Sequence, residues 1–299
     1  MSMEHHSPAL VDIVRLVRLA RTARLVAGLV AALALALPLL AAAPARAQQG
    51  YAPALTQEQI PLYNDGVRAI KAANQQIKAG DNDAAMKSTM QAEEKAKALG
   101  DAGTKLWLGV ARAYHQLNAI SKAEKALDHA GKNPDVDSTR ASLQRSRRQY
   151  GLGGPAVPPE KEPEFVRTVD KLNKDVAEKK LARGDLDAAL KTYPNAPALL
   201  TIDCEGKLRA NKRPAAEKLC RQALDGAPEL ARAHYLLGLS EADGPKRPDG
   251  AKHLEKALEL DPDDQGTWKA LADLYRKSQR KKDLADLSTK YKEKFNASL

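Results

Sequence analysis

Two stretches of the chain carry the same helix ending, one repeat apart. Residues 222–230 read QALDGAPEL, and residues 256–264, 34 positions further on, read KALELDPDD. Pro228 and Pro262 hold the same place in the two stretches. Proline cannot continue a helix, so each stretch predicts a helix end followed by a turn. Recurrence at a fixed period indicates a repeat architecture.

The same period extends outward in both directions. Small residues recur at positions 8, 20 and 27 of a 34-residue window, and large ones at positions 4, 7, 11 and 24. The clear windows are 104–137, 197–230, 231–264 and 265–298, and the weaker units are 66–99 and one starting near Asp170. The residues that carry the clear pattern are Trp107, Ala111, Tyr114, Ala123, Leu127, Ala130, Ala223, Leu237, Gly238, Ala257, Trp268, Leu271, Ala272, Tyr275 and Tyr291. The unit 66–99 contributes Ala73, Ala85 and Ala92, with a turn at Gly80-Asp81. The unit near Asp170 contributes Ala177 and Ala189, with a turn at Gly184-Asp185, and its second helix is cut short by Pro194 and Pro197.

This pattern resembles the tetratricopeptide repeat (TPR), in which W-x2-L-G-x2-Y is followed by alanines, a large residue and proline. The resemblance implies an all-α fold, an α-solenoid of stacked antiparallel helix pairs. Small residues at the seams let two backbones approach, and large residues fill the space around that contact. One hairpin cannot bury its apolar face alone, so neighbours must stack. Recurrence in phase disfavours the alternative of ordinary amphipathic helices with accidental spacing.

The N-terminus has the pattern of an export signal. Four arginines precede an uncharged apolar run, residues 25–43, which is followed by the small-residue cleavage pattern Ala45-Arg46-Ala47. The arginines are Arg15, Arg18, Arg21 and Arg24. The alanine-rich run is typical of bacterial signals, so we expect an exported protein, periplasmic or secreted. The alternative is an inner-membrane anchor formed by residues 25–43, which are long enough to span a bilayer.

A second boundary lies in the middle of the chain, where residues 151–163 read GLGGPAVPPEKEP. Glycine and proline at this density exclude a regular helix and indicate a linker between two groups of repeats. The expected parts are a signal peptide (1–47), a linker (48–65), an N-terminal TPR pair plus capping helix (66–150), a Gly/Pro linker (151–163) and a C-terminal TPR array (164–299).

Composition limits the class of partner. The chain has 299 residues, 43% of them hydrophobic, and a net charge of +10, and it stays mildly basic without residues 1–47. Such a charge suits acidic partners or an anionic envelope polymer. Nucleic-acid binding would need exposed aromatic side chains among the basic ones, and aromatics are only 4% of the chain. We therefore expect no nucleic-acid partner, and membrane contact only if the N-terminal segment is retained.

Cys204 and Cys220 are the only cysteines, at window positions 8 and 24 of one repeat. Packed helices lie about 8–10 Å apart, and each Cα lies about 2.3 Å off its axis. Facing Cα atoms are then within disulfide reach, and an exported protein meets an oxidising compartment. We predict a disulfide. The alternative is two small hydrophobic side chains in the core, and the spacing of nearby residues gives no metal site.

Motifs for catalysis are missing from the sequence. His115, His129, His234 and His253 fall in separate repeats, and neither H-E-x-x-H nor G-x-S-x-G nor a Walker sequence occurs. Glu255 and Glu259 flank Lys256 and are expected on a solvated helix face. We predict a protein that is not an enzyme and uses no cofactor, although dispersed catalytic residues would leave no motif.

The resemblance also implies where a partner binds, because first helices of TPR units line a concave groove. Carried over to this chain, the groove positions are Lys105, Leu108, Arg112 and His115 in one unit, Arg232, Tyr235 and Leu239 in another, and Lys269, Asp273, Arg276 and Lys277 in the last. This basic face with apolar patches suits an acidic or amphipathic peptide or helix. The expected function is a protein-binding scaffold of the bacterial cell envelope, the alternative being a basic structural protein that binds anionic envelope polymer.

Two further basic clusters are expected mainly as solvated surface. Arg140, Arg145, Arg147 and Arg148 lie on the helix that closes the first array. Their alternative role is a docking surface for an anionic partner. The second cluster, within residues 276–282, crowds the turn of the last repeat.

Overall fold

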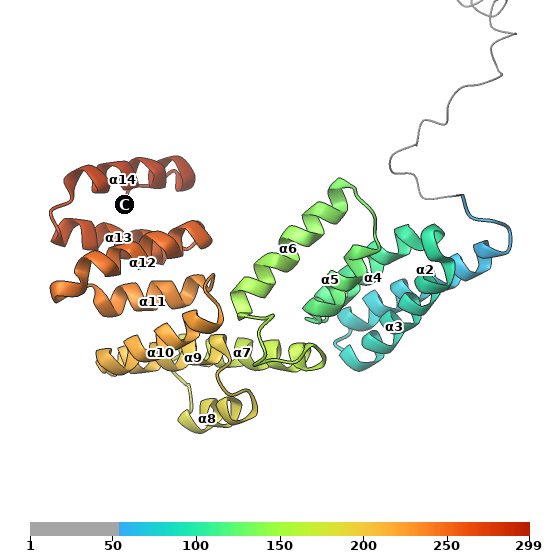
Figure 1. Ribbon diagram of the computed structural model, residues 1–299, viewed down its shortest axis with the longest axis horizontal. Helices are drawn as coiled ribbons and strands as arrows, with labels where there is room; N and C mark the ends of the chain where they lie inside the picture. The colour runs from blue at the N-terminus through green and yellow to red at the C-terminus, as the bar shows by residue number, and fades with distance from the viewer. Residues whose placement is uncertain (1–53) are drawn as a thin grey trace, which may run out of the picture. The chain divides into compact units, whose positions relative to one another are not determined.

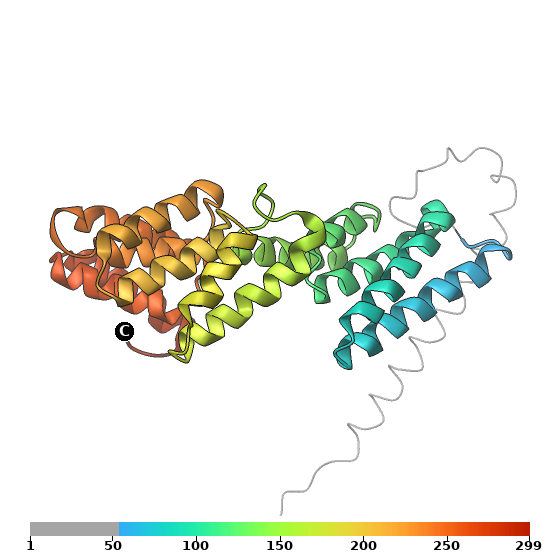
Figure 2. The same ribbon diagram turned by 90° about the horizontal axis from the view of Figure 1, so that it is seen from below.

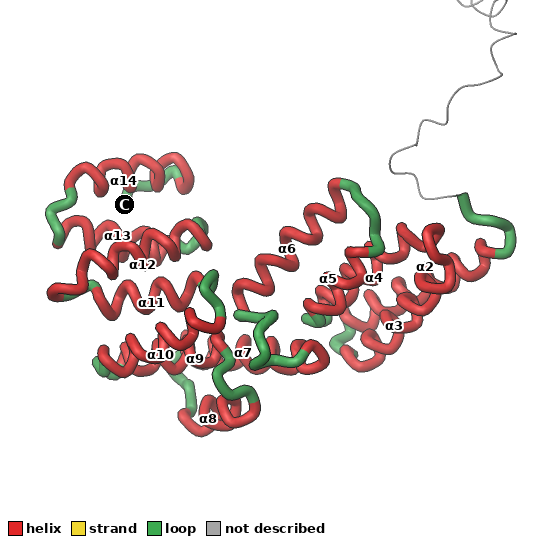
Figure 3. Tube along the Cα trace, in the orientation of Figure 1, coloured by secondary structure: helices red, strands yellow, loops and turns green. Residues whose placement is uncertain are grey.

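The computed structural model describes residues 54–299, and every regular element among them is helical (Figures 1 and 3). Six helical hairpins and one single helix follow one another, which confirms the predicted all-α repeat fold. The hairpins are α2 (Gln59–Lys78) with α3 (Asn82–Leu99), α4 (Thr104–Gln116) with α5 (Ile120–Asp128), α7 (Glu162–Ala177) with α8 (Arg183–Thr192), α9 (Pro197–Arg209) with α10 (Arg213–Gly226), α11 (Ala231–Glu241) with α12 (Arg247–Leu260), and α13 (Gln265–Lys277) with α14 (Lys281–Phe295). The single helix is α6 (Pro134–Tyr150), and short 3-10 helices lie at Gly100–Gly103, Pro159–Lys161 and Gly244–Lys246.

The two helices of a hairpin touch each other through small residues. Ala73, Ala85 and Ala92, from the weakly matching window, are all fully buried. In α11 and α12 the contact is made by two glycines, since a Cβ on Gly238 would lie 2.9 Å from the carbonyl oxygen of Gly250. Ala257, two turns after Gly250 on α12, is buried as the pattern predicts. The 34-residue spacing of small residues is therefore the spacing of backbone-to-backbone contacts.

Five of the six hairpin turns repeat one backbone geometry, whereas the turn between α11 and α12 contains the 3-10 helix Gly244–Lys246. A single residue with positive φ follows the first helix, such as Asn118 (61°) and Asn211 (58°). The next backbone N–H donates back into the last turn, from Ala119 to Tyr114 O and from Lys212 to Lys207 O, both within 2.9 Å. Asparagine and glycine tolerate the left-handed region best, so these positions end one helix and start the next.

The first hairpin starts earlier than the sequence pattern predicts. Helix α2 begins at Gln59, inside the span 48–65 that we expected to be a linker. Leu62 and Tyr63 explain the difference, because both pack against the hydrophobic core and so extend the helix by two turns. The expected signal peptide and cleavage site lie outside the described residues. Within residues 54–299, no helix is long and apolar enough to cross a membrane.

The Gly/Pro segment 151–163 is irregular up to residue 158, and it then forms the 3-10 helix Pro159–Lys161 and the first residues of α7. Leu152 and Val157 are buried, and they belong to one hydrophobic cluster that extends from α3 to α9. Glu162, at the end of the segment, is also buried, and it accepts hydrogen bonds from the Ser121 N–H (2.8 Å) and hydroxyl (2.5 Å) at the start of α5. Helix α6 contacts α4 and α5 on one side and α9 and α11 on the other. Helices on both sides of the segment therefore share one hydrophobic cluster, and the division into two groups of repeats stays a prediction from the sequence.

The unit starting near Asp170 also departs from its predicted phase. Ala177 lies exposed at the end of α7, and Gly184 and Asp185 lie in the first turn of α8 instead of in the preceding turn. Helix α7 buries large residues, Phe165 and Leu172 among them, so it does not approach its partner through a small-residue seam. Figure 2 shows α7 and its neighbours in a view turned by 90°.

Cys204 and Cys220 are joined by a disulfide bond between α9 and α10, with their Cα atoms 5.6 Å apart. Both side chains are fully buried. Ala216, Leu236 and Leu237 surround them in a small core cluster of their own. The bond therefore links the two helices of one hairpin inside its core.

Candidate functional site

The predicted groove positions on α11 are held by ion pairing and stacking. The Arg232 guanidinium lies 2.9 Å from a carboxylate oxygen of Glu205 on α9 and 5.0 Å above the ring of Tyr235. Glu205 is buried and also pairs with Arg209 at 2.8 Å. Burial raises the pKa of Tyr235, so its hydroxyl stays protonated. This part of the face offers one guanidinium, one aromatic edge and the half-buried Leu239.

On α13 the predicted positions are all exposed, and most are paired within the chain. Arg276 lies 2.6 Å from Asp273. Lys277 lies 3.5 Å from Asp243, which also pairs with Arg213 at 2.9 Å. Lys269 is exposed on the same helix. The face therefore carries neighbouring positive and negative charges and is not uniformly basic.

Helix α6 covers part of the third predicted set, on α4. Arg112 pairs with Asp135 at 3.4 Å, and His115 lies 3.0 Å from the Ser146 hydroxyl. Burial lowers the pKa of His115, so this ring is neutral at pH 7. Lys105 and Leu108 border a separate pocket of about 440 Å³ beside the start of α6. Lys105 and Arg112 nevertheless stay exposed, whereas Leu108 and His115 are half-buried.

Helix α6 also uses its arginines for contacts with α5. Arg147 lies 3.1 Å from Glu124, and Arg140 lies 3.4 Å from Asp128. Arg145 and Arg148 are exposed and border a pocket of about 400 Å³ together with Arg232. The expected solvated face is thus partly a packing surface between α5 and α6.

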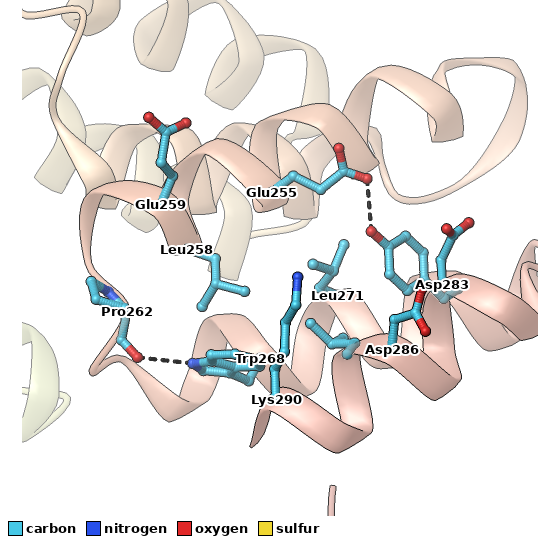
Figure 4. A pocket seen from close by; sticks show the side chains of 11 residues that line it. Glu255, Leu258, Glu259, Pro262, Trp268, Leu271, Asp283, Asp286 and Lys290 are labelled. Atoms are coloured by element: carbon cyan, nitrogen blue, oxygen red, sulfur yellow. Dashed lines mark hydrogen bonds between the residues drawn. The ribbon is translucent and has the colours of Figure 1, made fainter. Parts of the chain in front are cut away.

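A pocket that we did not predict opens between α12, α13 and α14 (Figure 4). Its volume is about 440 Å³, and it is lined by Glu255, Leu258, Glu259, Pro262, Trp268, Leu271, Tyr275, Asp283, Asp286, Leu287 and Lys290. Leucine, proline and aromatic side chains form the floor, and charged side chains form the rim. Such a size and mixture is typical of ligand-binding pockets.

Hydrogen bonds hold the pocket walls in place. The Trp268 indole N–H donates to the carbonyl oxygen of Pro262 at 2.9 Å, and the Tyr275 hydroxyl donates to Glu255 at 2.7 Å. Arg280 lies over the Tyr275 ring at 4.3 Å and pairs with both Glu255 (3.3 Å) and Asp283 (2.6 Å). Burial and the neighbouring carboxylate raise the pKa of Tyr275, so it remains a hydrogen-bond donor.

Two half-buried histidines and a buried glutamate form a titratable cluster between α11 and α12. The Nδ1 atoms of His234 and His253 lie 3.1 Å apart, and the outer Nε2 of His234 lies 2.9 Å from the carbonyl oxygen of Pro228. The carbonyl can only accept, so His234 carries its proton on Nε2 and its Nδ1 accepts from His253. Burial lowers the pKa of both rings and raises the pKa of nearby Glu241. The two rings pack α11 against α12 through their shared hydrogen bond, and the buried Glu241 pairs with Arg221 while its Oε2 lacks a hydrogen-bond partner within the described residues.

Chemistry-bearing side chains do not gather elsewhere in a metal-binding arrangement. No group of three or more His, Cys, Asp or Glu residues within the part that the structure describes could hold a metal ion. Whether the chain is an enzyme remains a prediction from the sequence.

Sequence reasoning missed the pocket because its parts come from three helices. Glu255 and Glu259 were expected on a solvated face, and they stand on the α12 wall of the pocket. One signal was available: Leu258 lies between them, one helical turn from Pro262, and leaves an apolar side chain among carboxylates. The acidic residues of α14 have no repeat position that would have placed them opposite.

Comparisons with known proteins give only distant similarities. No known protein family matches the chain, and no curated protein matches it either. Solved structures of human IFIT1 align in part: the dimer with PPP-AAAA is 15% identical over 80% of this chain and 72% of that chain, with a TM-score of 0.39. The dimer with m7Gppp-AAAA is 14% identical over 80% and 74%, TM-score 0.38, and a monomeric mutant with Gppp-AAAA is 16% identical over 78% and 73%, TM-score 0.38. Similarity this low carries no inference about ligands, and the fold assignment depends on the chain's own helices.

Proposed function

We propose that the chain is a non-enzymatic scaffold that binds a segment of a partner protein on the first helices of its C-terminal repeats. One observation carries the proposal: exposed cations stand on both α11 and α13, and those of α13 already hold carboxylates in exposed ion pairs, as Arg276 holds Asp273 and Lys277 holds Asp243. A partner carboxylate presents the same group to the same cations. Surface ion pairs contribute only about 0–1 kcal/mol, so an incoming carboxylate can replace the internal one.

Apolar side chains beside these cations favour an amphipathic partner. Tyr235 and Leu239 are half-buried on α11, so each leaves an apolar edge next to Arg232. A helix that carries carboxylates along one edge and apolar side chains along the next would meet both features. Guanidinium groups add directional pairing, because Arg232 can donate two parallel hydrogen bonds to a carboxylate.

Reversing two lysine charges of α13 tests this proposal. The tagged full chain and the variant Lys269→Glu/Lys277→Glu are used to capture partners from an envelope extract, with mass spectrometry as the readout. The control Lys132→Glu/Lys191→Glu makes the same charge change at exposed positions outside the face. We expect one dominant partner that the control retains and the variant loses. Equal capture by both variants would refute the first-helix site.

Salt concentration separates this function from polymer binding. Binding of a defined partner should persist when salt rises, whereas binding to anionic polymer should weaken steeply because it depends on many cation contacts. Capture that disappears at moderate salt, with no single protein retained, would favour the structural alternative. A single-stranded RNA oligonucleotide belongs in the same series, and we expect no binding to it.

The proposed cellular location is the periplasm or the exterior of a bacterium. Its support is the sequence pattern of residues 1–47, a basic segment, an apolar run and a small-residue cleavage site. Expression in a bacterial host, followed by fractionation and N-terminal sequencing, tests it. A soluble exported chain that begins at Gln48 is the expected result, and a full-length chain in the inner-membrane fraction would indicate an anchor instead.

A further inference from the structure

The pocket between α12 and α14 has the opposite charge to the rest of the chain. The whole chain carries a net charge of +10. Four carboxylates border this pocket, from Glu255, Glu259, Asp283 and Asp286, against the single cation of Lys290. A basic protein with a locally acidic apolar pocket selects against the acidic partners that its remaining surface attracts.

We propose that this pocket is a docking site for a basic amphipathic helix of a partner protein, distinct from the first-helix face of α11 and α13. Leu258 and Pro262 are the most accessible apolar groups of the pocket, and Trp268 and Leu287 expose only their edges (5% and 6%). Apolar side chains at i and i+4 of an incoming helix would cover these edges. The occupant must be a helix with lysine or arginine flanking that apolar stripe.

Two of the four carboxylates form the structure of the pocket and two remain for a partner. Glu255 and Asp283 share Arg280, which ties the walls of α12 and α14 together. Glu259 is 69% exposed and pairs with the exposed Lys256 of its own helix, a contact that a partner cation can displace. Asp286 is exposed on α14. Glu259 and Asp286 therefore present negative charge from opposite walls, one on each side of the apolar floor (Figure 4).

Charge also decides between this occupant and its alternatives. An acidic helix would place carboxylates against Glu259 and Asp286 and would gain only Lys290. An uncharged apolar ligand would use the floor and leave the rim without a role. Only a basic amphipathic segment contacts both the apolar floor and the acidic rim. The positively charged chain repels such a segment at long range, so the local acidic rim is necessary for binding.

Fluorescence anisotropy with defined peptides tests the proposal. The probe is a labelled leucine–lysine peptide of about 18 residues with amphipathic helical spacing, long enough to form a helix on binding. A second peptide of the same pattern has glutamate in place of lysine. The proteins are the full chain, the pocket variant Glu259→Lys/Asp286→Lys, and the control Asp249→Lys/Glu293→Lys. The control makes the same charge change at exposed positions on α12 and α14 that do not line the pocket.

The expected result is saturable binding of the lysine peptide, weakened about tenfold or more in the pocket variant and unchanged in the control. The glutamate peptide should not bind at this site. In a Trp107→Phe background, the lysine peptide should shift the emission of Trp268, the remaining tryptophan, which locates the contact even if the double reversal perturbs folding. Equal affinity in the pocket variant and the parent, an unchanged Trp268 emission, or no binding of the lysine peptide would each overturn the proposal. None of these results depends on the first-helix face, because its charged residues are unaltered.

Discussion

Adding one methyl group at either of two helical glycines should change stability in opposite directions. A Cβ on Gly238 of α11 would lie 2.7 Å from Leu254 Cγ and 2.9 Å from the backbone oxygen of Gly250, both on α12. A Cβ on Gly206 of α9 would meet nothing within 4 Å. Both glycines lie within helices, so alanine gains the same helix propensity at both sites, and only the packing differs.

The two magnitudes follow from these contacts. Alanine is favoured over glycine in a helix by about 1 kcal/mol, so Gly206→Ala should raise the free energy of unfolding by roughly 0.5–1 kcal/mol. At Gly238 the overpacking costs about 1–3 kcal/mol, because a backbone oxygen cannot rotate away as a flexible side chain can. Because the gain in helix propensity offsets about 1 kcal/mol of this cost, Gly238→Ala should lower the free energy of unfolding by up to about 2 kcal/mol. At this chain length about 2–4 °C in Tm corresponds to 1 kcal/mol.

Thermal and urea denaturation followed by circular dichroism measures both variants. Repeat proteins can unfold in parts, so hydrogen exchange of α11 and α12 should accompany the global measurement. We expect Gly250→Ala to behave like Gly238→Ala, since its Cβ would lie 2.9 Å from the Gly238 oxygen. A Gly238→Ala protein as stable as the parent would show that the seam is not a close backbone contact. Equal destabilisation by Gly206→Ala would attribute the loss to something other than packing.

Three other perturbations have defined outcomes. Reducing the Cys204–Cys220 disulfide, or replacing both cysteines by alanine, should lower the free energy of unfolding by about 3 kcal/mol for a loop of this length, as urea denaturation with and without reductant would show. Glu162→Ala leaves the half-buried Ser121 donors at the start of α5 without their acceptor and should cost about 1–3 kcal/mol, visible as faster hydrogen exchange in α5 than elsewhere. Burial lowers the pKa of His234 and His253 in the folded chain, whereas the unfolded chain has an ordinary pKa of about 6.5. The unfolded state therefore binds protons first, so the stability due to these rings is present above about pH 6.5 and is lost as the pH falls below it; His253→Gln should flatten the fall in Tm between about pH 7.5 and 5.5.

The repeat could be predicted wherever close backbone contact requires a small residue. Ala111, Ala223 and Ala257 are buried because nothing larger fits between two helices there, and the sequence records that requirement every 34 residues. Helix α7 has no such requirement, because it meets its neighbours through Phe165 and other large residues. The small residue that the pattern assigns to it, Ala177, lies exposed. The 34-residue pattern can thus predict helix positions only in hairpins whose two helices meet through small residues.

The pocket and the continuity of the core needed three-dimensional information for a different reason. Glycine and proline within 151–158 correctly exclude a helix, but composition alone does not distinguish an open linker from an irregular segment that buries Leu152 and Val157. Long-range partners decide that, and the capping of Ser121 by Glu162 joins residues 41 positions apart. The same holds for Glu259 and Asp286, which line one pocket only because the fold brings α12 and α14 together with α13. Contacts that recur between adjacent helices produce a periodic pattern that can be seen in the sequence. Contacts that occur only once produce no such pattern and become visible only in the folded structure. The candidate binding pocket depends on contacts of this second kind.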